Sequence, residues 1–159
     1  MDPYRILFVC AGNICRSPLA EGVFRHLAAT AGYADAYHID SAGTGGWHEG
    51  EAPDPRSVAV AKAHGIDISR QRARRIRATD FRSFDLILAM DDDNLRNLLS
   101  EASSEAKCRV HLFSGFATGG SEEVPDPYYG GKDGFEQVYA MLLEGCGALL
   151  DRLETERRS

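Results

Sequence analysis

Short apolar runs alternate with longer amphipathic segments along this chain. Polar or glycine-containing stretches bound the apolar runs, which is typical of buried β-strands. These runs cover residues 6–9, 37–41, 86–90 and 110–113. The amphipathic segments carry apolar side chains three and four residues apart, the spacing of one helix face. They predict helices over residues 18–27, 55–64, 91–99 and 135–153.

The order of these elements predicts an α/β fold. A strand, a helix and a second parallel strand form a right-handed crossover, so the alternation indicates a four-stranded parallel sheet flanked by helices. No internal repeat or linker-like stretch divides the sequence, and residues 1–159 are expected to form a single domain. Residues 114–124, which contain a Thr-Gly-Gly-Ser tip, are expected to be a loop.

The first strand is expected to end close to Cys10, just before the first helix. Ser17 precedes Pro18 in this segment. Serine is a preferred N-cap and proline is favoured as the first helical residue, so Ser17 is predicted to cap the helix. The loop over residues 10–17 then lies beyond the carboxyl end of a parallel strand, where ligands of such sheets bind.

Composition and charge narrow the classes of function. The chain is 43% hydrophobic and 26% charged, as in an ordinary globular domain, and its formal net charge is -6. This charge gives no general attraction to nucleic acid or to an anionic membrane surface, so neither is an expected partner. No secretory leader and no apolar run of membrane-spanning length is present, which favours a cytoplasmic protein.

Four cysteines are too few for a secreted disulfide framework and are expected to be reduced. They are Cys10, Cys15, Cys108 and Cys146. Cys108 and Cys146 are expected in the core, the latter on the apolar face of the last helix.

The segment between the first strand and the first helix has the chemistry of an anion site. It reads Cys-Ala-Gly-Asn-Ile-Cys-Arg-Ser. Inward-turned backbone N–H groups at a helix N-terminus form a positive pocket for a phosphate dianion. Gly12 and Asn13 tolerate the positive φ values that this turn needs. Arg16 can bind two phosphate oxygens with its planar fork, and the same field stabilises a Cys10 thiolate, to which the Ser17 hydroxyl can donate.

This loop resembles the active-site loop of the low-molecular-weight protein tyrosine phosphatases. Cysteine and arginine separated by five residues would be weak support alone, but the full loop together with a late Asp-Pro-Tyr-Tyr is highly specific. The resemblance extends over essentially the whole chain in the family's order. The further matching segments are residues 40–44, 64–66, 73–76, 84–85, 90–91, 94–95 and 126–130.

The resemblance implies a metal-free, two-step hydrolysis of phosphotyrosine in proteins, that is, a phosphoric monoester hydrolase without a cofactor. Cys10 would attack phosphorus to form a phosphocysteine, while Asp126 protonates the departing tyrosyl oxygen and later acts as general base. Arg16 and the loop amides would hold the charge of the phosphoryl group. Tyrosine-phosphorylated proteins are the expected partners, and inorganic phosphate is the expected product and competitive ligand.

Further residues are expected to form the substrate pocket or to support its loop. Trp47, Tyr128 and Tyr129 are suitable walls for a cleft that admits a phosphotyrosine ring. The resemblance implies that Asn13, with Ser41, holds the loop in shape. The expected substrate-binding residues are Ala11, Gly12, Asn13, Ile14, Cys15, Ser17, Trp47, Tyr128 and Tyr129.

Several local patterns have two interpretations. Cys15 could form a reversible disulfide with Cys10 or simply pack within the loop. Asp126 begins an Asp-Pro pair, which is common in turns, and only the resemblance favours a catalytic role. Five arginines between Arg70 and Arg77 are typical of a solvated face but could guide acidic phosphopeptides. The five histidines show no metal-ligand spacing.

Four other functions share parts of this pattern. An arsenate reductase needs a further pair of cysteines, which residues 79–99 lack. In the protein arginine phosphatases, the position that corresponds to Ile14 looks like threonine, so Ile14 favours phosphotyrosine. An inactive phosphotyrosine-binding module would lack Cys10, Arg16 or Asp126, and all three are present. A P-loop nucleotide hydrolase would need Gly-Lys-Ser/Thr after the loop.

Overall fold

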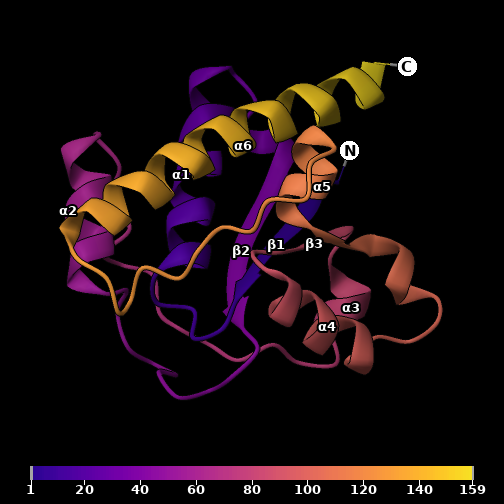
Figure 1. The fold of residues 1–159 in the computed structure, drawn as a ribbon. Coiled ribbons are helices and arrows are strands. Elements are labelled where there is room, and N and C mark those ends of the chain that lie inside the picture. Colours follow the sequence, from indigo (N-terminus) through magenta and orange to yellow (C-terminus); the bar gives the residue numbers. More distant parts are fainter. Residues whose placement is uncertain (1, 159) are drawn as a thin grey trace.

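A four-stranded parallel sheet with helices on both faces forms the centre of the computed structural model (Figure 1). The structure describes residues 2–158, so the two terminal residues of the expected 1–159 domain lie outside it. The strands are β1 (Tyr4–Cys10), β2 (Tyr37–Gly43), β3 (Leu86–Ala89) and β4 (Val110–Leu112). Their order is β2-β1-β3-β4, and every neighbouring pair is parallel. The predicted fold class is therefore confirmed.

The central strand β1 is buried on both faces. Its neighbours are in register, with Ile6 opposite both Ile39 of β2 and Leu86 of β3. Successive side chains alternate, so Phe8 belongs to the core on one face and Leu7 to the core on the other. A strand covered on both faces needs apolar residues without interruption, which explains the unbroken run in the sequence.

Helices divide between the two faces of the sheet. Those over the larger core are α1 (Arg16–Thr30), α2 (Pro55–Ala63), α5 (Phe113–Thr118) and α6 (Lys132–Arg158). Over the other face lie α3 (Asp80–Ser83) and α4 (Asp92–Glu101), and two short 3₁₀ turns complete the fold, η1 (Ala34–Ala36) and η2 (Ala106–Arg109). Within residues 2–158, no helix is long and apolar enough to cross a membrane.

The expected cap of the first helix is wrong. α1 begins at Arg16, Cys15 takes the N-cap position, and no side chain caps the helix. The Ser17 hydroxyl instead lies 3.0 Å from the Cys10 sulfur, so it belongs to the loop network rather than to the helix end. The Ser17 N–H of the first turn points at the same sulfur, from 3.5 Å.

The segment expected as a loop after β4 contains a helix. β4 ends at Leu112, and Phe113, predicted as the last strand residue, begins α5. Phe113 and Ala117, four residues apart, are buried in the larger core, so tertiary packing stabilises a helix that its internal glycine disfavours. Gly119 ends α5 at a φ of 79°, a left-handed conformation that glycine adopts without strain.

Candidate active site

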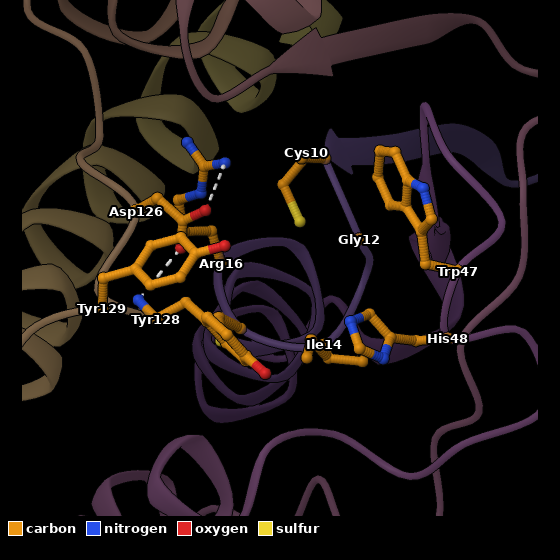
Figure 2. Close-up of a pocket in the computed structure, with 11 residues that line it drawn as sticks. Cys10, Gly12, Ile14, Arg16, Trp47, His48, Asp126, Tyr128 and Tyr129 are labelled. Atoms are coloured by element: carbon orange, nitrogen blue, oxygen red, sulfur yellow. Dashed lines mark hydrogen bonds and ion pairs between the residues drawn. The ribbon is translucent and has the colours of Figure 1, made fainter.

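A pocket of about 420 Å³ opens at the carboxyl end of β1 (Figure 2). Three separate parts of the chain form it: the loop after β1, the glycine-rich loop after β2, and the loop before α6. Its lining residues are Cys10, Ala11, Gly12, Ile14, Cys15, Arg16, Trp47, His48, Asp126, Tyr128 and Tyr129. The other expected site residues, Asn13, Ser17 and Ser41, lie buried behind the loop.

Cys10 ends the central strand and is almost fully buried, with 2% of its surface exposed. Figure 2 shows its sulfur directed into the pocket, between Arg16 with Asp126 on one side and Trp47 on the other. The backbone N–H of Ser17 points at the sulfur from 3.5 Å, and the Ser17 hydroxyl lies 3.0 Å away. These donors at the start of α1 favour a negative charge on the sulfur.

Asn13 holds the loop from behind. It is the one described non-glycine residue with a positive φ, 59°. Its Nδ2 donates to the hydroxyls of Ser17 at 2.8 Å and Ser41 at 3.0 Å, and its Oδ1 accepts the Arg74 N–H at 2.9 Å. Because Ser17 accepts from Asn13, its own hydrogen is available to the Cys10 sulfur.

Ser41 connects this network to a buried carboxylate. Its hydroxyl donates to Glu21 Oε1 at 2.7 Å, and Glu21 is 6% exposed. Burial raises the pKa of Glu21, although the bonds from Ser41 and Arg25 act in the opposite direction. The loop around Cys10 is therefore supported through hydrogen bonds from β2 and α1.

Arg16 is fixed by partners on the sheet side of the pocket. Its Nη1 donates to Asp91 Oδ2 at 2.6 Å and to the Val124 carbonyl at 3.0 Å. Burial acts to lower the pKa of Arg16, but the Cys10 sulfur, Asp91 and Asp126 raise it to a value above its ordinary one. The guanidinium therefore stays charged and oriented, with Nη2 on the pocket side.

Asp126 takes part in a turn and also reaches the pocket, so its two interpretations are compatible. Its Oδ1 accepts the Tyr128 N–H at 3.1 Å, and its Oδ2 lies 3.6 Å from Arg16 Nη2 (Figure 2). The side chain is 42% exposed. A carboxyl group in this position can exchange protons with both the pocket and solvent.

Aromatic side chains form the rim of the pocket. Tyr128 and Tyr129 meet edge to face with ring centroids 5.0 Å apart, and Trp47 stands opposite them (Figure 2). Trp47 is 72% exposed and Tyr129 is 92% exposed, which leaves apolar surface free at the entrance. The Trp47 ring packs on Gly45, where a β-carbon would approach it to 2.2 Å.

One lining residue was missed by sequence reasoning. His48 lies next to Trp47, and its ring centroid is 6.3 Å from that of Tyr128, while its Nδ1 lies 2.9 Å from Glu51. Its position beside the tryptophan of a glycine-rich loop was the available signal. Gly12 faces this ring closely, since a β-carbon there would lie 3.1 Å from His48 Cδ2.

A family model described as "Low molecular weight phosphotyrosine protein phosphatase" matches residues 5–159. The chain belongs to this family. A relative of that name from Schizosaccharomyces pombe is 47% identical over 142 residues, which are 88% of this chain and 90% of that protein. The expected family and its enzyme class, a phosphatase, are thus confirmed.

Solved structures of similar proteins have the same fold. The protein tyrosine phosphatase of Entamoeba histolytica, crystallised with Hepes in its active site, has a TM-score of 0.92 and 39% identity, covering 97% of this chain and 99% of that one. The arginine phosphatase YwlE of Bacillus subtilis has a TM-score of 0.89 and 28% identity, covering 97% and 98%. Fold alone therefore does not separate these two substrate classes.

The cysteines of this family member differ in their surroundings. Burial raises the pKa of Cys15 to about 12, and the charges of Asp54, Cys10 and Asp126 act in the same direction. All four cysteines are free thiols. Cys146 is buried as expected, but the expectation for Cys108 is wrong: it is exposed on η2 and donates to the Glu105 carbonyl.

The arginine-rich segment is only partly a solvated face. Arg74 is half-buried, and its guanidinium bonds to Asp40 and Asp80. Its backbone N–H donates to Asn13 Oδ1, so this arginine supports the loop around Cys10. The other four arginines of the segment, at positions 70, 72, 75 and 77, are exposed. Across residues 2–158, no three His, Cys, Asp or Glu side chains are grouped so that they could hold a metal ion.

Proposed function

We propose that this chain hydrolyses phosphotyrosine in proteins through a phosphocysteine at Cys10, without a metal ion. The observation that carries the proposal is that one pocket unites the Cys10 sulfur, a charged Arg16 and the Asp126 carboxyl group. A nucleophile, an electrostatic clamp and a proton donor are the groups that phosphoryl transfer from an aromatic oxygen requires.

The phosphate dianion would bind in the loop after β1, against the backbone N–H groups at the start of α1 and the Nη2 side of Arg16. Asp91 and the Val124 carbonyl already fix Nη1, so the fork is preorganised for this contact. The tyrosine ring would lie between Trp47 and Tyr128, with Ile14 beneath it.

In the first step, the Cys10 sulfur attacks phosphorus. The S–P bond forms as the bond from phosphorus to the tyrosyl oxygen breaks, and the proton of Asp126 passes to that oxygen. Tyrosine leaves as the neutral phenol, and Asp126 is left as a carboxylate. Arg16 and the loop amides stabilise the charge on the three other phosphoryl oxygens.

In the second step, Asp126 accepts a proton from water as the water oxygen attacks phosphorus. The S–P bond breaks, inorganic phosphate forms, and the electron pair returns to the Cys10 sulfur as a thiolate. The Ser17 hydroxyl at 3.0 Å can donate to this leaving sulfur. A nucleophile of this kind must stay reduced, which supports a cytoplasmic setting.

Two features favour phosphotyrosine over phosphoarginine. The rim offers aromatic surface at Trp47, Tyr128 and Tyr129, which suits an aromatic ring. Ile14 in the wall is apolar and offers no side-chain acceptor to a guanidinium. In the arginine phosphatases, the corresponding position looks like threonine and not isoleucine, which points the same way.

The test is hydrolysis of 4-nitrophenyl phosphate and of peptides carrying phosphotyrosine, phosphoserine or phosphoarginine, in a chelator. Cys10→Ser should abolish turnover, and Asp126→Ala should lower kcat by roughly 10²- to 10⁴-fold. Cys108→Ser is the matched control, because this thiol is exposed and outside the pocket. Full activity of Cys10→Ser, or a preference for phosphoarginine, would overturn the proposal.

A further inference from the structure

Arg56, near the start of α2, binds the loop that carries Asp126. Its Nη2 donates to the Tyr128 carbonyl at 3.0 Å and its Nη1 to the Gly130 carbonyl at 3.3 Å. Among the described residues, the side-chain hydrogen bonds that reach residues 127–131 from another element come from this arginine, and the Gly134 N–H of α6 adds a backbone bond to the Gly131 carbonyl at 3.1 Å. Arg56 is thus the side chain that fixes the backbone after Asp126 from outside this loop.

The guanidinium of Arg56 is itself fixed. Its Nε and Nη2 donate to the two oxygens of Asp54 at 3.0 and 2.9 Å, a bidentate pair. Its Cζ lies 4.5 Å from the centroid of Phe135 in the first turns of α6 and 5.6 Å from that of Tyr128. A planar fork with a carboxylate, two carbonyls and two rings around it has little freedom to move.

The same end of α2 is bound to the loop that carries Cys10. The Asp54 N–H donates to the Ile14 carbonyl at 2.8 Å, and the Ser57 hydroxyl donates to the Cys15 carbonyl at 3.3 Å. Both carbonyls belong to residues that line the pocket. The start of α2 therefore contacts the nucleophile loop on one side and, through Arg56, the Asp126 loop on the other.

The carboxyl group of Asp126 has few restraints of its own. Its distance to Arg16 is 3.6 Å, longer than a hydrogen bond, its bond to the Tyr128 N–H is local, and 42% of the side chain is exposed. The position of this carboxyl group over the pocket therefore depends on where its backbone is held.

We propose that Arg56 is a positioning residue for the general acid: it ties the Asp126 loop to the start of α2 and so sets the place of the carboxyl group relative to Cys10. The inference rests on the proposed function of Asp126. A misplacement of about 1 Å can cost up to about 100-fold in rate, so a tether of this kind is significant. Lysine cannot replace it, because one ammonium group cannot bind a carboxylate and two carbonyls in a plane.

The decisive measurement is kcat/KM for two aryl phosphates that differ in their leaving group. Phenyl phosphate releases a strongly basic phenolate and depends on the general acid, whereas 4-nitrophenyl phosphate releases a weakly basic one and depends on it less. Arg56→Gln should lower kcat/KM for phenyl phosphate by about tenfold and that for 4-nitrophenyl phosphate by about twofold or less. Arg56→Lys should fall close to the glutamine variant.

A double-mutant cycle identifies the route of the effect. In an Asp126→Ala background, Arg56→Gln should cause no further loss with phenyl phosphate, because the group that it positions is gone. An equal loss in both backgrounds, or an equal loss with both substrates, would overturn the proposal, since Arg56 would then act on the pocket independently of Asp126.

Arg152→Gln is the matched control. Arg152 is 43% exposed, against 41% for Arg56, pairs with Glu156, stacks over Phe116 and donates to the Phe116 carbonyl. It lies on α6 away from the pocket lining. Its loss should leave kcat/KM unchanged for both substrates, which separates a positioning effect from the general loss of a surface arginine.

A second readout does not need activity. Amide hydrogen exchange in residues 126–131 should speed up in Arg56→Gln and not in Arg152→Gln. If the wild type hydrolyses neither substrate, the proposed function fails, and exchange still shows whether Arg56 holds the loop. Unchanged exchange in Arg56→Gln would overturn the tether whatever the activities are.

Discussion

Asn13 combines a strained backbone with three side-chain hydrogen bonds, and the two contributions can be separated. Asn13→Ala removes the bonds and keeps the β-carbon at a φ of 59° without a compensating polar group. Asn13→Gly removes the same bonds at no conformational strain in the folded state. We expect alanine to be less stable than glycine by about 1 kcal/mol in urea unfolding, with both well below the wild type.

The control for this comparison is Gly12, which precedes Asn13 and needs no positive φ. In Gly12→Ala, the new β-carbon would lie 3.1 Å from His48 Cδ2, and this side chain can move away. The substitution should therefore cost less stability than Asn13→Ala. If the alanine and glycine variants of Asn13 unfold at the same urea concentration, backbone strain is not what selects asparagine here.

Single residues of the loop were largely predictable, because each position has a restricted set of suitable residue types. A positive φ at Asn13 followed from the side chain's tolerance of that region, and the closeness of the Ser17 hydroxyl to Cys10 followed from the loop spacing. The bond from Arg74 to Asn13 did not, since 61 residues separate the two and only the folded sheet brings them together. The cap role of Ser17 failed for the same reason: tertiary partners in the loop engage its hydroxyl.

The start of α2 offers a test at the level of the element. Asp54 is its N-cap and accepts the Arg56 N–H at 2.9 Å. The hydrogen bonds that Arg56 donates lower the pKa of Asp54 and burial raises it, and the net result is a pKa below the ordinary 3.8. Asp54→Ala removes the cap and should lower the free energy of unfolding by about 1 kcal/mol at pH 7. Asp54→Asn keeps a capping oxygen and loses the charge, so it should be less destabilised.

The pH dependence of this effect has a definite sign. Because the folded-state pKa of Asp54 is lowered, its charge stabilises the fold above pH 3.8 and loses this contribution as the pH falls through the lower folded-state value. The gap in unfolding free energy between wild type and Asp54→Asn, measured in urea, should therefore be present at pH 7 and shrink below pH 3.8. A gap that grows with acid would contradict this assignment.

Elements with a long periodic pattern were predictable from the sequence, and a short element stabilised by tertiary packing was not. α6 shows its apolar face over many turns, and the predicted strand ends differ from the observed ones by at most two residues. α5 is short, contains a glycine and follows an apolar run without a break, so its residues were divided between a strand and a loop. Burial of Phe113 and Ala117 against the core decides its conformation, and that burial is not visible locally.

For the whole molecule, the sequence pattern predicted which edge of the sheet carries the pocket, but not how distant loops meet there. Parallel strand order places the carboxyl end of β1 beside those of β2 and β3. Asp126 lies 110 positions after Arg16, and its approach to that side chain depends on the path of the chain between β4 and α6. In that part of the sequence, only the resemblance pointed to a role for Asp126. The single domain over residues 1–159 stays a prediction.

Binding of inorganic phosphate should stabilise the whole fold. A ligand that binds only the folded state adds RT ln(1 + [L]/Kd), about 2.7 kcal/mol at a hundred times Kd. The pocket that the anion would occupy joins β1, α1 and the loop before α6, so the effect should be global, and the melting temperature should rise by several degrees. The measurement is thermal unfolding in phosphate and in sodium chloride at the same ionic strength.

The matched variants show where the anion binds. Arg152→Gln should keep the full phosphate shift, while Arg16→Met should lose most of it, each variant being compared with its own melting temperature in chloride. Arg16 is 2% exposed and its Nη2 faces the pocket, so its loss removes the clamp and not a surface charge. An equal shift in chloride, or a full phosphate shift in Arg16→Met, would place the bound anion outside this pocket and contradict the clamp role of Arg16.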